Sequence, residues 1–183
     1  MAASAQTRYY HSSSPGVASG DVTGLTVRYQ LADQDTQNAT FPLNQPASGV
    51  NLSWRKSSKI NFVTTPATAI QNLRWFMSQA PSTGISLFAR VQSAGTYVQA
   101  SSADAAGIAG FTDTTPNQAT NNATNYTAVS PLSVNAGTVL SNPNTGEGSQ
   151  VFVETQFGVA SSYALGPGVI PTPSQVTYRY AES

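Results

Sequence analysis

The chain has 183 residues and a mass of 19.1 kDa, with eight basic and eight acidic side chains, one histidine and no cysteine. Disulfides and cysteine-based metal sites are excluded, and a zinc site is nearly excluded, because zinc takes about three or four nitrogen, sulfur or carboxylate ligands. The formal net charge is zero, which argues against nucleic-acid binding, because proteins that bind nucleic acids cluster Lys and Arg to displace counterions.

Charged residues make up 9% of the chain, against about 25% in an ordinary globular protein. Enzymes gather His, Cys, Asp, Glu and Lys in one cleft to move protons, attack carbonyls or hold metals. With so few of these groups, we expect no catalytic residues, no cofactor and no metal. Neutrality also removes the repulsion that keeps copies apart, so the composition favours assembly or binding.

The first 21 residues are small and polar and show no regular alternation. Their one cluster of aromatic and basic side chains is Arg8, Tyr9, Tyr10 and His11, and such residue types are enriched among interface anchors. We predict that residues 1–21 form an extended arm outside the core, that this cluster contacts a neighbour, and that residues 22–183 form one domain. No apolar run has the length of a signal peptide or a transmembrane helix, so we expect neither export nor membrane insertion.

Alternating apolar and polar residues, typical of half-buried strands, begin near residue 24. The turn at residues 94–95 predicts a hairpin between segments 85–91 and 96–98, and residues 100–125 lose periodicity, as in a long interaction loop. We predict an all-β fold, a single antiparallel β-sandwich or jelly-roll-like domain with about nine to eleven short strands. The strand segments are residues 26–31, 50–54, 60–62, 69–77, 85–91, 96–98, 126–134, 138–140, 151–159 and 176–180.

Residues 69–77 are the one ambiguous segment. A helix would place Ile70, Leu73 and Met77 on one stripe, whereas a strand would place Leu73, Trp75 and Met77 on one face. We favour the strand, because prolines bracket a segment only about a dozen residues long and the neighbouring segments are β.

Two patterns could carry chemistry near the N-terminal half. His11 lies in a serine-rich segment, and the chain has no G-x-S-x-G motif, so a contact residue or a solvated one is the favoured interpretation. Asp33, Asp35 and Asn38 are spaced somewhat like a calcium loop. The glycine of the sharp turn and the terminal glutamate are missing, which favours a solvated corner over a Ca²⁺ site.

The remaining charged candidates are an acid pair and a basic group. Glu147 and Glu154 could meet as the two carboxylates of a glycosidase, but nothing in their spacing requires it. Arg55, Lys56 and Lys59 form a local positive group, which we interpret as a solvated turn.

The aromatic residues could form a platform on which sugars stack. At alternating strand positions, however, most aromatic residues belong to the core, and Trp54 and Trp75 lie inside apolar segments. We favour the core for the set as a whole: Trp54, Trp75, Tyr97, Tyr126, Tyr163, Tyr178 and Tyr180.

Two short motifs resemble a group of β-sandwich virion structural proteins of tailed bacteriophages. In that group a G-x-N-x-S-W/Y-x-K strand follows a loop rich in Asn and Pro, and an I-x-N-L-R-W/F strand comes next. The resemblance covers residues 24–100 and the last strand, with matching positions Gly49, Asn51, Ser53, Trp54, Lys56, Ile70, Asn72, Leu73, Arg74 and Trp75.

This resemblance implies a capsid decoration or minor capsid protein in the virion. Its partners would be copies of itself and a major capsid protein, with no nucleic acid or membrane involved. The alternatives are a carbohydrate-binding or adhesion module, which needs exposed aromatic residues, and a small hydrolase, which needs a cleft with converging acids.

Overall fold

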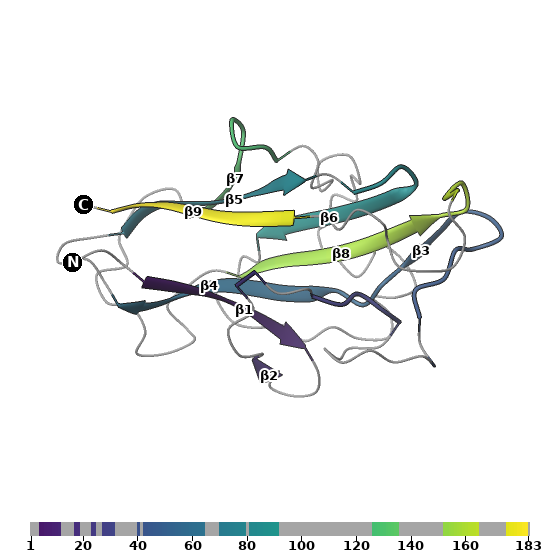
Figure 1. Ribbon diagram of the computed structural model, residues 1–183, viewed down its shortest axis with the longest axis horizontal. Helices are drawn as coiled ribbons and strands as arrows, with labels where there is room; N and C mark the ends of the chain where they lie inside the picture. The colour runs from purple at the N-terminus through teal and green to yellow at the C-terminus, as the bar shows by residue number, and fades with distance from the viewer. Residues whose placement is uncertain are drawn as a thin grey trace.

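The protein is built entirely from β-strands, arranged as two antiparallel sheets that pack together (Figure 1). The computed structural model describes residues 4–11, 17–18, 23–24, 27–31, 40, 42–64, 70–79, 81–91, 126–135, 152–164 and 175–182. Nine strands lie within these ranges. The antiparallel β-sandwich predicted from the alternating pattern is therefore confirmed.

The larger sheet has six strands, with β8 at its centre. On one side β8 pairs with β6, and on the other it pairs first with β4 and then with β3; β1 continues the sheet beyond β4, and β2 pairs with the end of β1. The strands are β1 (Ser4–His11), β2 (Val17–Ala18), β3 (Val50–Leu52), β4 (Lys56–Thr64), β6 (Ile85–Val91) and β8 (Val153–Ala160).

The smaller sheet has three strands in the order β7-β5-β9: β7 (Leu132–Asn135), β5 (Ile70–Gln79) and β9 (Gln175–Glu182). Residues 70–77 thus fall in a strand, as predicted, and Leu73, Trp75 and Met77 point into the core. Asn72 has a positive φ of 56° within an irregular stretch of the β5–β9 pairing, a conformation that Asn tolerates better than most residues.

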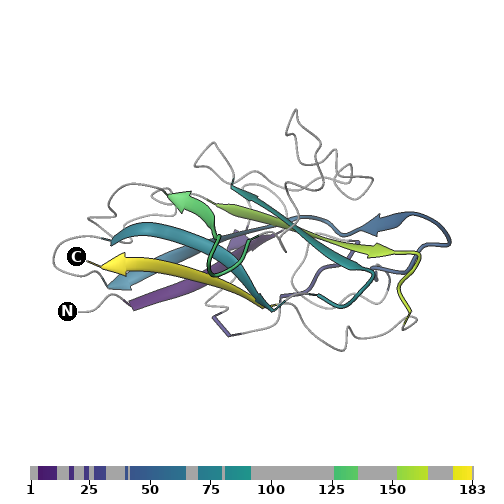
Figure 2. The same cartoon turned by 90° about the horizontal axis from the view of Figure 1, so that it is seen from above.

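The hydrophobic core lies between the two sheets. Trp75 and Phe62 are fully buried at its centre, and Phe62 meets Tyr180 of β9 edge to face at 4.9 Å. The start of β1 and the end of β9 lie at the same end of the molecule, whereas β3 lies at the opposite end (Figures 1 and 2).

A tight turn leads into β6 and depends on glycine. Gly84 has a φ of +84°, and a Cβ at this position would lie 2.8 Å from the Tyr163 Cα atom. Its carbonyl accepts a hydrogen bond from the Ala160 N–H at 2.8 Å, which ties the turn to the end of β8. Only glycine satisfies both the backbone conformation and the close approach.

The predicted N-terminal arm is wrong for residues 4–11. These residues form β1, which pairs along β4 from Ser4↔Thr64 to Tyr10↔Ser57, and both Tyr9 and Tyr10 are buried. Successive residues of β1 face opposite sides of a sheet that is covered on both sides, so the segment shows no alternation of apolar and polar residues.

The strand predicted at residues 26–31 is also wrong, because residues 27–31 form no strand. This segment is held by a backbone hydrogen bond from Trp54 N–H to Gln30 O at 3.0 Å, and by the Tyr29 ring, which packs on Phe157 at 4.7 Å. The apolar residues therefore mark contact with the core rather than a ladder of hydrogen bonds.

The later strand predictions are confirmed at β6, β8 and β9, and the last of these ties the C-terminal segment into the smaller sheet. Strand structure in the segment 126–134 is restricted to β7. The predicted strands at 96–98 and 138–140, the loop 100–125 and the turn 141–148 lie outside the described residues.

Candidate functional site

Several charged residues, among them Arg90, Glu154 and Lys59, lie on the face of the larger sheet that points away from the smaller one. Residues directly opposite in neighbouring strands share a face, and the register places Arg90, Glu154, Ser57 and Tyr10 in one row across β6, β8, β4 and β1. The core lies on the other face, with Val153 and Phe157 of β8. Glu154, Ser57 and Tyr10 are nevertheless fully buried, so both faces of this sheet are covered.

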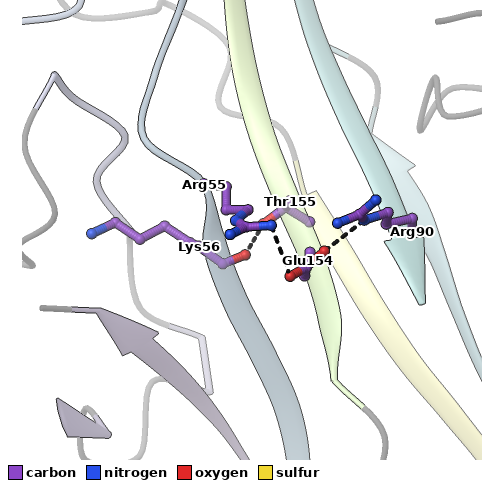
Figure 3. Close-up of polar contacts among 5 residues, drawn as sticks. All are labelled: Arg55, Lys56, Arg90, Glu154 and Thr155. Carbon is purple, nitrogen blue, oxygen red and sulfur yellow. Dashed lines mark hydrogen bonds and ion pairs between the residues drawn. The ribbon is translucent and has the colours of Figure 1, made fainter. Parts of the chain in front are cut away.

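Glu154 is held between two guanidinium groups (Figure 3). Arg90 Nε donates a hydrogen bond to Glu154 Oε2 at 2.6 Å, and Arg55 Nη1 lies 3.3 Å from Glu154 Oε1. The Glu154 side chain is 1% exposed, that of Arg55 6% and that of Arg90 15%. We call these three residues the Glu154 triad. Short contacts between charged groups at this depth fix the relative positions of β6, β8 and the start of β4.

The two lysines of the same segment are buried next to different groups. Lys59 Nζ lies 5.5 Å from the centre of the Tyr10 ring and 5.4 Å from that of Phe152, within the range of cation–π attraction. Lys56 points away from Glu154, and its carbonyl oxygen accepts a hydrogen bond from the Thr155 hydroxyl at 3.2 Å (Figure 3).

The interpretation of Arg55, Lys56 and Lys59 as a solvated turn is therefore wrong. All three are buried, and Lys56 and Lys59 belong to β4. The physical reason is that partners distant in the sequence compensate for the lost hydration: a carboxylate on β8 for Arg55, and the rings of Tyr10 and Phe152 for Lys59. The local sequence contains neither partner.

A chain of buried hydroxyl groups lies on the core face of the same strands. The Thr155 hydroxyl donates to Lys56 O, so Tyr29 must donate in the 2.6 Å hydrogen bond between Tyr29 OH and Thr155 Oγ1. Likewise Ser58 Oγ donates to Val153 O at 3.3 Å, so Tyr178 is the donor in its 2.9 Å hydrogen bond with Ser58.

Tyr9 joins Tyr29 and Tyr178 in this group, through side-chain hydrogen bonds with Tyr29 and Ser58. Burial is the main cause that raises the pKa of each of these three tyrosines above the ordinary value of 10.0, and proximity of the other phenols raises those of Tyr29 and Tyr178 further. The three phenols thus remain protonated over the whole physiological range, as their roles as donors require.

These raised pKa values predict alkaline unfolding. Folding keeps the three phenols protonated, so their contribution to stability is complete below about pH 10, the pKa in the unfolded chain. It is lost at higher pH, because only the unfolded state then releases the protons, and each phenol can lower the free energy of unfolding by about 1.4 kcal/mol per pH unit.

Urea denaturation at several pH values between about 8 and 11 measures this slope. A variant with Tyr9, Tyr29 and Tyr178 replaced by Phe is expected to lose stability less steeply with pH. An unchanged slope in that variant would contradict the assignment.

The four residues predicted to contact a neighbour all lie in β1. Tyr9 faces the core, Tyr10 is buried on the opposite face beside Phe152, and Arg8 is half-buried opposite Lys59. His11 ends β1, where it pairs with Val17 of β2. Tyr9 and Tyr10 are therefore buried within the fold, and they do not form the predicted surface cluster that would contact a neighbour.

The other sequence candidates are only partly described. Asp33, Asp35, Asn38 and Glu147 lie outside the described residues, and the described neighbours of Glu154 are the two arginines. Trp75 is completely buried and meets Tyr126 edge to face at 6.3 Å, while Trp54 is half-buried. Trp75 thus belongs to the core, as expected, and provides no surface for a sugar.

The Glu154 triad and the tyrosine group were both missed by sequence reasoning. Neither contains the combination of nucleophile and base that covalent catalysis uses, and Glu154 and Tyr9, at the centres of the two groups, are buried. Within the described ranges, no group of three His, Asp or Glu side chains could hold a metal ion, and no helix is long and apolar enough to cross a membrane. The two groups are thus suited to fixing strands in place.

Comparison with models of protein families, with curated proteins and with solved structures found no match.

Proposed function

We propose that this protein is a non-enzymatic structural protein of a virion, a capsid decoration or minor capsid protein that binds the particle surface and copies of itself. The observation that carries the proposal is the location of its charges. All eight Lys and Arg residues are described: Arg55, Lys56 and Lys59 are buried, only Arg28 and Arg179 are exposed, and the rest are half-buried.

A surface with so few exposed cations has little long-range attraction or repulsion. Copies can then pack closely without a penalty from like charges, and specificity has to come from contact at short range. The buried ion pairs and phenols hold a sandwich rigid without offering a reactive group to solvent. Such a body suits an assembled shell better than a catalytic cleft, and the resemblance of two strand motifs to phage virion proteins supports the same role.

The proposal predicts that attachment is insensitive to salt. Raising the ionic strength from about 0.15 M to about 1 M shortens the Debye length to roughly 3 Å and removes surface electrostatics, but it leaves apolar and hydrogen-bonded contacts in place. Sedimentation of the purified chain, alone and with shells of a major capsid protein, is expected to give the same bound fraction at both salt concentrations.

Release of the protein over that range would mean that its few exposed charges dominate the interface. A chain that sediments as a monomer at every concentration and does not bind shells would contradict the structural role itself.

A further inference from the structure

The two sheets differ in width, and the difference leaves a cleft at one side of the sandwich. Sheet order places β7 near β6 and β9 over β4, so no described strand of the smaller sheet lies over β1. A cleft of about 280 Å³ occupies this position, between β1 and β9, which lie on the same side of the molecule (Figures 1 and 2). Its walls include Ala5, Gln6, Thr7, Val176, Thr177 and Tyr178.

Three consecutive residues of each strand line this cleft. Tyr9 and Tyr180 line it too, so alternate residues of both strands face the space between the sheets, while Gln6 and Thr177 between them border it as well, which places the cleft beside the outer edge of β9. The volume is slightly below the roughly 300–1,000 Å³ of pockets that enclose whole small molecules. The cleft is therefore suited to a few side chains of an added strand.

The main-chain groups of β9 can be oriented from one hydrogen bond on its neighbour. Met77 N–H donates to Tyr126 O at 3.0 Å, so the main-chain groups of Met77 face away from β9. In an antiparallel pair of strands, opposite residues alternate between pairs that exchange main-chain hydrogen bonds and pairs that do not. Met77 is opposite Val176, and Trp75 is opposite Tyr178. The N–H and C=O groups of Val176 and Tyr178 therefore face away from β5, whereas those of Thr177 bond to it.

On the opposite wall of the cleft, the edge of β1 already has a hydrogen-bond partner. Thr7 N–H donates to Thr23 Oγ1 at 2.8 Å, and this side chain covers the edge of β1 at that point. In the described part of the chain, β9 pairs with β5 alone. A new strand can thus extend the smaller sheet from β9, while it covers the inner face of β1.

We propose that an extended segment of a second copy of this chain adds to the outer edge of β9 (residues 176–180) as a fourth strand, with alternate side chains in the cleft. The absence of charged residues in the cleft favours an uncharged segment of this kind. Every residue that lines it is uncharged, so a charged strand would lose its hydration without compensation. Outside its described strands this chain offers uncharged segments, such as residues 114–125. The inference rests on the proposed function, in which copies of this chain bind one another, and it names the surface through which they bind.

Proline substitution in β9 tests the surface. Val176→Pro removes an N–H that bonds to no strand within the described fold, while Thr177→Pro is the matched control that removes a hydrogen bond to β5. Sedimentation velocity over a concentration series is expected to show self-association weakened about tenfold or more for Val176→Pro, with circular dichroism unchanged. Thr177→Pro is expected to lower the melting temperature instead.

Amide hydrogen exchange of the unmodified chain gives a second measurement that needs no variant. The Val176 and Tyr178 amides are expected to become protected as the chain associates, while the Thr177 amide is protected in both states. If assembly leaves the first two amides unprotected, or Val176→Pro assembles as tightly as the unmodified chain, this surface is wrong and the proposed function stands. A chain that remains monomeric at all concentrations overturns this surface, and it overturns the proposed function as well if it also fails to bind shells of a major capsid protein.

Discussion

Deletion of residues 1–11 is expected to unfold the protein. β1 covers the long outer edge of β4, and its loss removes Tyr9 from the tyrosine group and Tyr10 from Phe152 and Lys59. Loss of each large buried aromatic side chain costs about 3–5 kcal/mol, so the two together remove an amount comparable with the whole stability of about 5–15 kcal/mol of a typical domain.

The measurement is far-UV circular dichroism with urea denaturation of the deleted chain. Deletion of residues 1–3 is the matched control, because it leaves all of β1 (Ser4–His11) in place. The point variant Tyr10→Ala, expected to lose about 3–5 kcal/mol, tests the same contact without shortening the chain. A cooperative, near-native unfolding transition after deletion of residues 1–11 would show that β1 is a dispensable arm.

Substitution of Glu154 by Gln is expected to lower the free energy of unfolding by about 3–5 kcal/mol. The substitution preserves the shape of the side chain and removes its charge, so Arg55 and Arg90 lose the buried carboxylate that lies between them. The melting temperature is expected to fall on the order of 10 °C.

The control is Glu182→Gln, which removes the same charge from an exposed position of β9 and is expected to change stability by less than about 0.5 kcal/mol. A triple variant, Arg55→Met, Arg90→Met and Glu154→Leu, leaves no charge behind and is expected to be more stable than Glu154→Gln alone. If Glu154→Gln and Glu182→Gln behave alike, the triad makes no net contribution to the fold.

Alternation of apolar and polar residues predicts a strand when one face of the sheet is apolar and the other is polar or mixed. β5 follows this rule, because Leu73, Trp75 and Met77 face the core while Arg74 and Phe76 are only half-buried. The prediction failed for β1, where the adjacent aromatic residues Tyr9 and Tyr10 are buried on opposite faces of the sheet. It failed in the other direction at Tyr29, which reaches the core from a segment without strand pairing.

The candidate site could not be predicted, because it is made by contacts between distant segments. Nothing near Arg55 in the sequence indicates that Glu154 lies across from it, and a run of basic residues in a polar stretch is ordinarily solvated. Of the three tyrosines, Tyr178 was predicted to be a core residue and Tyr9 was not, and their hydroxyl partners Ser58 and Thr155 depend on the register of β4 and β8. Register is a property of the assembled sheet.

The inward location of the basic residues has a consequence for proteolysis. Trypsin cleaves after lysine and arginine, and of the eight such residues only Arg28 and Arg179 are exposed in the folded chain, the second of them within β9. Proteases bind extended, accessible segments, so the remaining sites can be cut only after the sandwich opens. The rate at which trypsin cuts at these remaining sites therefore measures how often the strands separate, and a particle built from such a protein would gain resistance to digestion there from the same side chains that hold its sheet together.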